Sequence, residues 1–135
     1  MKSHYRVVVI GGGVVGASVI YHLSKFGWKD ICLLERSVLS AGSSWHAAGG
    51  IHALNADPNM SALQAYTIDL LPQVEKESGE NIGLHMTGGL TMAGTPERWE
   101  WLQSAYRVYQ SIGIEDCRLV TPEEASKLNP IMSTE

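Results

Sequence analysis

The most constraining feature of this sequence is a glycine-rich turn between an apolar run and a helical pattern. The apolar run covers residues 6–10, and residues 11–16 then carry glycines at the spacing G-x-G-x-x-G. Residues 14–26 place apolar side chains at helical spacing, and residues 31–34 form a second apolar run. These features predict a βαβ unit with parallel strands, and we expect its first strand to be fully buried.

Each glycine of the turn has a geometric reason in a dinucleotide-binding site. Gly11 allows a tight turn, Gly13 lets the backbone approach a pyrophosphate, and Gly16 lets the helix pack close to the strand. The phosphates would meet unpaired N–H groups of Val14 and Val15 at the positive end of the helix dipole. Outside a strand-and-helix context, the same glycines would be an ordinary turn of an α/β protein.

An acidic residue closes the second strand where a dinucleotide site binds ribose. Glu35 lies 22 residues after Gly13, and Arg36 follows it. A carboxylate there can accept hydrogen bonds from ribose hydroxyls. It would also repel a 2′-phosphate, which disfavours NADP.

The segment after the acid favours FAD over NAD. Residues 37–50 are rich in serine, glycine and alanine with little periodicity, which indicates a loop. Small residues with hydroxyl and N–H groups can wrap more phosphate and reach a flavin, whereas an NAD domain more often begins its next helix there. From composition alone, an ordinary surface loop is the alternative. Trp45 could shield the flavin or only anchor the loop.

Residues 9–16 (VIGGGVVG), 33–36 (LLER) and 41–50 (AGSSWHAAGG) carry a family resemblance that continues through residues 83–89 and 119–130. They resemble the dimethylglycine and sarcosine dehydrogenase family, in the D-amino-acid-oxidase-like branch of FAD enzymes. The Trp-His-Ala-Ala-Gly segment is the specific part, because the glycine fingerprint is shared more widely. The resemblance implies an FAD-dependent oxidation of the C–N bond of N-methylated glycines or similar secondary or tertiary amines to an imine.

The resemblance also implies a role for His46, because the histidine of this segment carries the flavin covalently in that family, through the 8α-methyl group. A neutral imidazole nitrogen can attack the methide tautomer of the flavin, and small neighbours let the ring come close. Judged from the residues alone, a single loop histidine would be ordinary. The candidate cofactor-binding residues are Gly11, Gly13, Val14, Val15, Gly16, Glu35, Arg36, Ser43, Ser44, His46, Ala47 and Gly49.

The resemblance makes residues 1–135 the N-terminal part of a longer FAD/NAD(P)-binding oxidoreductase domain. The catalytic residues, the substrate domain and a folate-type region are expected beyond residue 135. We therefore expect this chain alone to be inactive and to bind FAD weakly or not at all. The full-length enzyme would use a small amine as substrate, with tetrahydrofolate and an electron-transfer flavoprotein as partners. Unfinished sheet edges would favour self-association of this chain.

The rest of the chain predicts helices and a short strand pair. Residues 60–77 have helical spacing that Pro72 should kink or split. Residues 84–86 and 90–93 flank a Thr-Gly-Gly segment and predict two short strands, as in a hairpin. The fold class is therefore α/β: an incomplete Rossmann-like FAD-binding domain with additional helices and short strands.

Two helix starts are signalled by threonine followed by proline and an acidic residue. Thr95 and Thr121 stand at these N-cap positions, and Glu124 completes a capping box with the second. In the helix that follows Thr95, one face is expected in the core; it carries Trp99, Leu102, Tyr106 and Tyr109.

Charge and cysteine content narrow the class of partner. The formal net charge is −4 with no basic cluster, and no run of about 18 apolar residues occurs, so neither nucleic acid nor membrane is expected. Cys32 and Cys117 form no C-x-x-C, and no zinc spacing occurs, so we expect reduced thiols and no metal. The expected location is cytoplasmic, or the mitochondrial matrix in a eukaryote, although no transit peptide is seen.

Two other functions stay open from the sequence. The chain could belong to a non-catalytic flavoprotein or regulatory relative, since the family includes a phosphatase-regulating subunit. It could also be an NAD-binding dehydrogenase domain. A visible flavin spectrum would separate an NAD-binding domain from the two flavoproteins. Amine turnover would then separate the enzyme from the regulatory protein.

Overall fold

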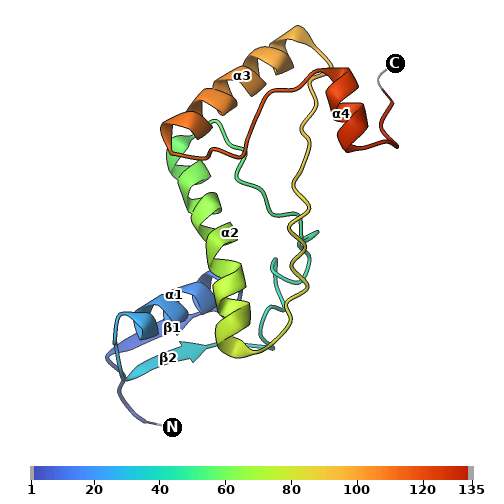
Figure 1. Cartoon of the computed structure of the whole chain (residues 1–135). Helices are drawn as coiled ribbons and strands as arrows, with labels where there is room; N and C mark the ends of the chain where they lie inside the picture. Colours follow the sequence, from blue (N-terminus) through green and yellow to red (C-terminus); the bar gives the residue numbers. More distant parts are fainter. Residues whose placement is uncertain (1, 134–135) are drawn as a thin grey trace. The chain divides into compact units, whose positions relative to one another are not determined.

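The two N-terminal apolar runs pair as parallel strands in the computed structural model, which describes residues 2–133 (Figure 1). Strand β1 (Val7–Ile10) pairs with β2 (Ile31–Leu34), with Val7 opposite Ile31 and Ile10 opposite Leu34. Helix α1 (Val14–Lys25) connects them. The predicted βαβ unit is confirmed, and it lies in the first of two compact units, Met1–Gly50 and Ile51–Glu135.

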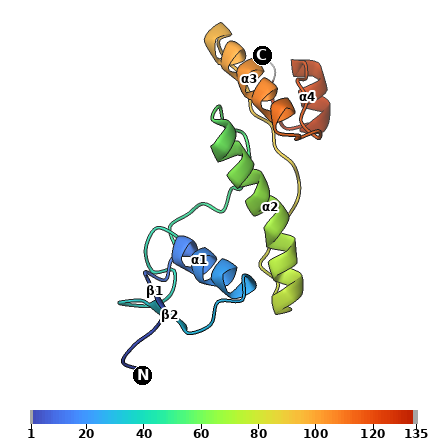
Figure 2. The ribbon, with the colours of Figure 1, turned by 90° about the vertical axis from the view of Figure 1, so that its left-hand side faces the viewer.

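The expectation that β1 is fully buried is wrong. Its side chains alternate: Val7 and Val9 are partly covered, whereas Val8 is 44% exposed and Ile10 is 86% exposed. Parallel strands are buried on both faces only where helices cover both faces of the sheet. Figure 2 shows the single helix α1 lying along this strand pair within the first unit. The exposed strand residues are therefore apolar positions that lack cover in this unit.

Helix α1 ends where the sequence predicted. Its C-cap is Phe26, and Gly27 follows with a φ of 80°. The N–H of Trp28 donates to the carbonyl of Leu23 at 3.0 Å, which satisfies a carbonyl of the last turn. A residue with positive φ after the last helical turn is the usual way for a helix to stop, and glycine adopts it without strain.

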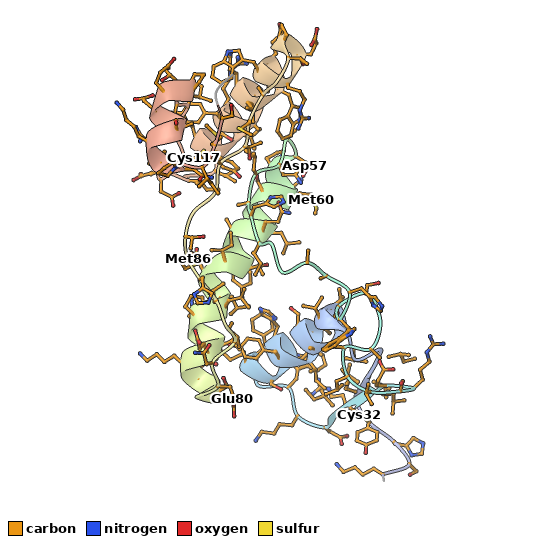
Figure 3. All side chains as sticks on the ribbon, turned by 90° about the vertical axis from the view of Figure 1, so that its right-hand side faces the viewer. Cys32, Asp57, Met60, Glu80, Met86 and Cys117 are labelled. Atoms are coloured by element: carbon orange, nitrogen blue, oxygen red, sulfur yellow. The ribbon has the colours of Figure 1, made fainter. Side chains whose placement is uncertain are left out.

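The second unit begins with helix α2 (Pro58–Ser78), which starts two residues before the predicted pattern. Asp57 is the N-cap and accepts the N–H of Met60 at 2.9 Å; Figure 3 labels both residues at the start of the helix. The sequence predicted a kink or a break at Pro72, and the break does not occur. Nearly four turns precede the proline, so the loss of one backbone hydrogen bond does not end the helix.

Helices α3 (Pro96–Ser111) and α4 (Pro122–Leu128) begin at the predicted threonines. Thr95 accepts the N–H of Arg98, and Thr121 and Glu124 form the reciprocal capping box. The buried hydrophobic side chains of this unit come from these two helices and are Leu102, Ala105, Tyr109 and Ala125. Of the helix face that was expected in the core, Leu102 and Tyr109 are thus buried, but Trp99 is 40% exposed. Among the described residues, no helix is long and apolar enough to cross a membrane.

The predicted strands at 84–86 and 90–93 are not found in the described chain. Residues 79–95 instead run back along α2 toward the start of α3 without regular structure (Figures 1 and 2). Gly83 and Gly88 both have positive φ, and the N–H of Thr87 donates to the carbonyl of His85 two residues earlier. An extended segment becomes a strand only when a partner satisfies its backbone groups, and this segment has none here.

Candidate cofactor site

The glycine turn has the backbone geometry that the fingerprint demands. Gly11 has a φ of 105°, and Gly16 is buried. A Cβ on Gly16 would overlap the carbonyl oxygen of Gly11, so only glycine lets α1 approach the end of β1 this closely. These are the conformational roles predicted for Gly11 and Gly16. They place the first turn of α1 directly against the turn that precedes it.

The start of α1 presents N–H groups that are free to bind an anion. Among the described residues, the N–H groups of Gly13, Val15 and Gly16 have no hydrogen-bond partner. The first N–H groups of any helix lack intrahelical acceptors, and the helix dipole makes this end positive. The fourth group, the N–H of Val14, donates to Oγ of Ser44 at 2.8 Å.

Glu35 holds the glycine turn from the end of β2. Its Oε2 accepts the N–H of Gly12 at 2.7 Å, and its Oε1 accepts the N–H of Ser37 at 2.9 Å. The bond from Gly12 and then the bond from Ser37 hold the pKa of this carboxyl below its usual range, because both stabilise the carboxylate. Glu35 is therefore charged at neutral pH. The sequence predicted an acid facing ribose and missed its bond to the turn.

The loop after Glu35 folds back onto the glycine turn. We call residues 37–46 the serine loop. The N–H of Ser40 donates to the carbonyl of Gly12 at 2.9 Å, and the Ser44 hydroxyl accepts the N–H of Val14. A Cβ on Gly13 would stand 3.2 Å from Oγ of Ser44, so glycine at 13 also leaves room for this serine. The structure thus brings Ser44 to the predicted phosphate turn.

His46 lies on the exposed part of the serine loop. Its Nδ1 is 2.9 Å from the carbonyl oxygen of Gly42. A carbonyl oxygen can only accept, so the proton of the neutral ring is on Nδ1 and Nε2 carries the lone pair. Trp45 is 79% exposed, so it does not anchor the loop by burial. The remaining predicted residues of this region, Arg36, Ser43, Ala47 and Gly49, are also exposed.

These observations fit the phosphates of an adenine dinucleotide. Three free N–H groups stand at a positive helix end, where Gly13 is half-buried and Val15 is exposed. The acid at the end of β2 is charged and partly exposed. Sequence reasoning missed the bond between Ser44 and Val14, because the two residues are 30 positions apart and no spacing rule connects them. Within residues 2–133, no group of three His, Cys, Asp or Glu side chains is placed to hold a metal ion.

The second unit contains an apolar hollow of about 810 Å³. Residues 90–94 and the chain before α4 line it, together with Trp99 and Leu102 of α3 and Ala125 of α4. None of the predicted cofactor-binding residues lies in this hollow. Most of its lining residues are apolar.

Comparison with known proteins agrees with this geometry. Residues 6–135 match the family described as FAD dependent oxidoreductase. The mitochondrial dimethylglycine dehydrogenase of Rattus norvegicus is 35% identical, over 98% of this chain and 15% of that protein. The mitochondrial pyruvate dehydrogenase phosphatase regulatory subunit of Mus musculus is 34% identical, with the same coverage. The chain thus spans about 15% of the length of these curated relatives.

A solved structure shares the fold. The crystal structure of L-proline dehydrogenase from P. horikoshii superposes with a TM-score of 0.84 at 25% identity. The superposition covers 96% of this chain and 34% of that one. The arrangement of strands, turn and helices is therefore that of the corresponding part of a larger chain, and the predicted incomplete α/β, Rossmann-like class is confirmed.

Proposed function

Since this chain belongs to the FAD-dependent oxidoreductase family, we propose that it binds the adenosine and phosphate end of FAD in an enzyme that oxidises N-methylated glycines or similar amines. The cofactor of the family is FAD, so the NAD-binding alternative is set aside. The observation that carries the proposal is the set of free N–H groups of Gly13, Val15 and Gly16 at the start of α1.

Each of the residues around the turn has a task in this proposal. The N–H groups of Gly13, Val15 and Gly16 would receive the phosphate oxygens, and Glu35 would accept hydrogen bonds from the adenosine ribose. The bonds that Glu35 receives from Gly12 and Ser37 leave lone pairs on both carboxylate oxygens. Arg36, Ser43, Ala47 and Gly49 would line the path beyond the phosphates. When bound, FAD supplies a two-electron acceptor for a hydride equivalent from the carbon attached to nitrogen.

His46 is the proposed point of covalent attachment. Its Nδ1–H donates to Gly42, so Nε2 is the nitrogen with a free lone pair and is the atom we assign to the bond. The ring is exposed on the serine loop, and its small neighbours Ala47 and Ala48 leave space around it. The support for this role is the family resemblance together with this tautomer.

The test uses the natural full-length protein that carries this sequence. We expect the purified protein to show the visible absorbance of bound flavin. Anaerobic addition of N-methylglycine or N,N-dimethylglycine should bleach that absorbance as the flavin is reduced. N,N,N-trimethylglycine is the matched control. Its nitrogen has no lone pair to support loss of hydride from the neighbouring carbon, so it should leave the spectrum unchanged.

The outcomes separate the candidate functions. A protein that lacks flavin altogether contradicts the proposal and its main alternative together. A flavoprotein whose spectrum no N-methylated amine bleaches favours the regulatory alternative, which is supported by the 34% identity to a phosphatase regulatory subunit. Bleaching by the methylated glycines but not by the quaternary control supports the oxidoreductase.

The partners of the full-length protein are part of the same proposal. Oxidation of an N-methyl group to an imine leaves a one-carbon unit that tetrahydrofolate can accept. The reduced flavin then needs an electron acceptor, for which we propose an electron-transfer flavoprotein. Both are tested by adding each partner to the amine-reduced protein and following reoxidation of the flavin and loss of free formaldehyde. Self-association of this chain stays a prediction.

A further inference from the structure

Ser44 connects the loop that carries His46 to the first turn of α1. Its Oγ accepts the N–H of Val14 at 2.8 Å, which satisfies one of the N–H groups that a helix leaves open at its start. A side-chain acceptor is usually supplied by the N-cap residue. Here the N-cap is Gly13, which has no side chain, and a residue 30 positions later takes over.

The bond to Val14 is the connection of the serine loop nearest to His46. The other bond to the glycine turn is made by the backbone of Ser40, four residues before Ser44. Ser44 is partly buried, whereas Trp45 and His46 directly after it are exposed. Without the hydroxyl, the loop would still be held at Ser40, whose carbonyl accepts the N–H of Trp45 at 3.0 Å, but the part that carries His46 would lose its direct bond to α1.

We propose that Ser44 is a positioning residue that couples occupation of the phosphate site to the order of the loop around His46. This inference rests on the proposed function. A hydroxyl accepts through its lone pairs and still has one O–H to donate. Ser44 can therefore hold Val14 and donate to a phosphate oxygen at the same helix start. A bound phosphate would then hold the Ser44 hydroxyl in place, and the hydroxyl would hold the loop around His46.

The experiment measures hydrogen exchange of the full-length apoprotein with ADP as the probe. ADP carries the adenosine and two phosphates but no flavin, so any response of the loop must come from the phosphate end. At ADP near one hundred times its Kd, exchange through openings that release the ligand slows by up to roughly a hundredfold. In the unmodified protein, we expect slowing both at residues 11–16 and at residues 40–48.

Two variants remove the two partners of the bond independently. Ser44→Ala deletes the acceptor. Val14→Pro deletes the donor at the first helical position, where proline is well tolerated and where the extended Gly13 (φ −79°, ψ −176°) suits a following proline. At saturating ADP, each variant should keep the slowing at residues 11–16 and at Ser40, which stays bonded to Gly12, and lose it at residues 43–48. The double variant should behave like either single one.

Ser44→Thr keeps the hydroxyl and should restore the loop response. Ser37→Ala is the matched control, because Ser37 lies in the same loop, is exposed and bonds Glu35 only through its backbone N–H. A loop that responds to ADP in Ser44→Ala as in the unmodified protein overturns the inference. If Ser44→Ala does not fold, Val14→Pro decides in the same way. Absence of any response in the unmodified protein contradicts the cofactor site itself, and the inference with it.

Discussion

Gly12 and Glu35 are joined by a hydrogen bond of 2.7 Å, in which the backbone N–H of Gly12 donates to Oε2 of Glu35. The carbonyl of Gly12 in turn accepts the N–H of Ser40. The middle residue of the glycine turn is therefore held from both sides by the chain that follows β2. Glu35 therefore stabilises the conformation of the glycine turn in the absence of any bound ribose.

This bond predicts a pH dependence of the glycine turn. The pKa of Glu35 is lowered in the folded chain, mainly by the N–H of Gly12. Its contribution to stability is therefore full above the ordinary pKa of 4.5 and is lost as the pH falls through the lower, folded-state value. We expect the protection factors of the hydrogen-bonded amides of Gly12 and Val14, corrected for intrinsic exchange, to fall in this acidic range.

Glu35→Gln should remove that dependence, because the amide cannot titrate, and should lower protection at neutral pH. Ser37→Ala is a control in the same segment, since Ser37 bonds Glu35 through its backbone N–H, which the substitution keeps. Equal slopes against pH in the unmodified protein and in Glu35→Gln would show that another group governs this turn.

The close contact at Gly16 predicts that even a methyl side chain at this position lowers the stability of α1. A methyl group there would overlap the carbonyl oxygen of Gly11, so α1 and the turn must move apart. We expect Gly16→Ala to destabilise α1 by about 1–3 kcal/mol, as overpacking typically does, and to weaken FAD binding. Gly50→Ala is the control, because a Cβ there meets nothing within 4 Å. Protection of α1 by hydrogen exchange measures the effect, and equal protection in both variants would contradict it.

The elements of the first unit could be predicted because their signals are local. The apolar runs, the glycine spacing and the stop at Gly27 each specify backbone geometry within a few residues. The exposure of Val8 and Ile10 could not be predicted from β1 alone, since it depends on which other elements cover the sheet. The hairpin at 84–93 failed for the same reason. Its two runs contain one β-branched residue, Thr91, and no Phe, Tyr or Trp, so their own preference for a strand is weak, and no partner strand satisfies their backbone here.

The sequence predicted residues of the candidate site but not the hydrogen bonds that join them. Residue type and position in the fingerprint pointed to Glu35 and to the glycines. The bond from Val14 to Ser44 depends on how the serine loop folds back, and the loop has no periodicity from which to predict that path. Buried polar contacts are missed in the same way, because a sequence does not show which serine is enclosed.

Ser61 is such a residue, and it gives a prediction for the second unit. It is fully buried, and its hydroxyl donates to the carbonyl of Ala53 at 2.6 Å, which ties the chain before α2 to the helix. Ser61→Ala leaves a half-buried carbonyl without its donor, so we expect a loss of about 1–3 kcal/mol. Hydrogen exchange of residues 53–65 measures it. Ser104→Ala, on an exposed position of α3, should change local stability by less than about 0.5 kcal/mol.

His46 gives the sharpest prediction for the flavin. Its hydrogen bond to Gly42 within the loop leaves Nε2 as the nucleophilic nitrogen, and the exposed ring contributes little to folding. After acid denaturation of the full-length protein, we expect the yellow colour to stay with the polypeptide. His46→Ala should release all of its FAD under the same treatment while keeping the unfolding midpoint of the unmodified protein. His52→Ala, an exposed histidine six residues later, should retain the colour. Flavin that stays attached in His46→Ala would place the covalent bond at another residue.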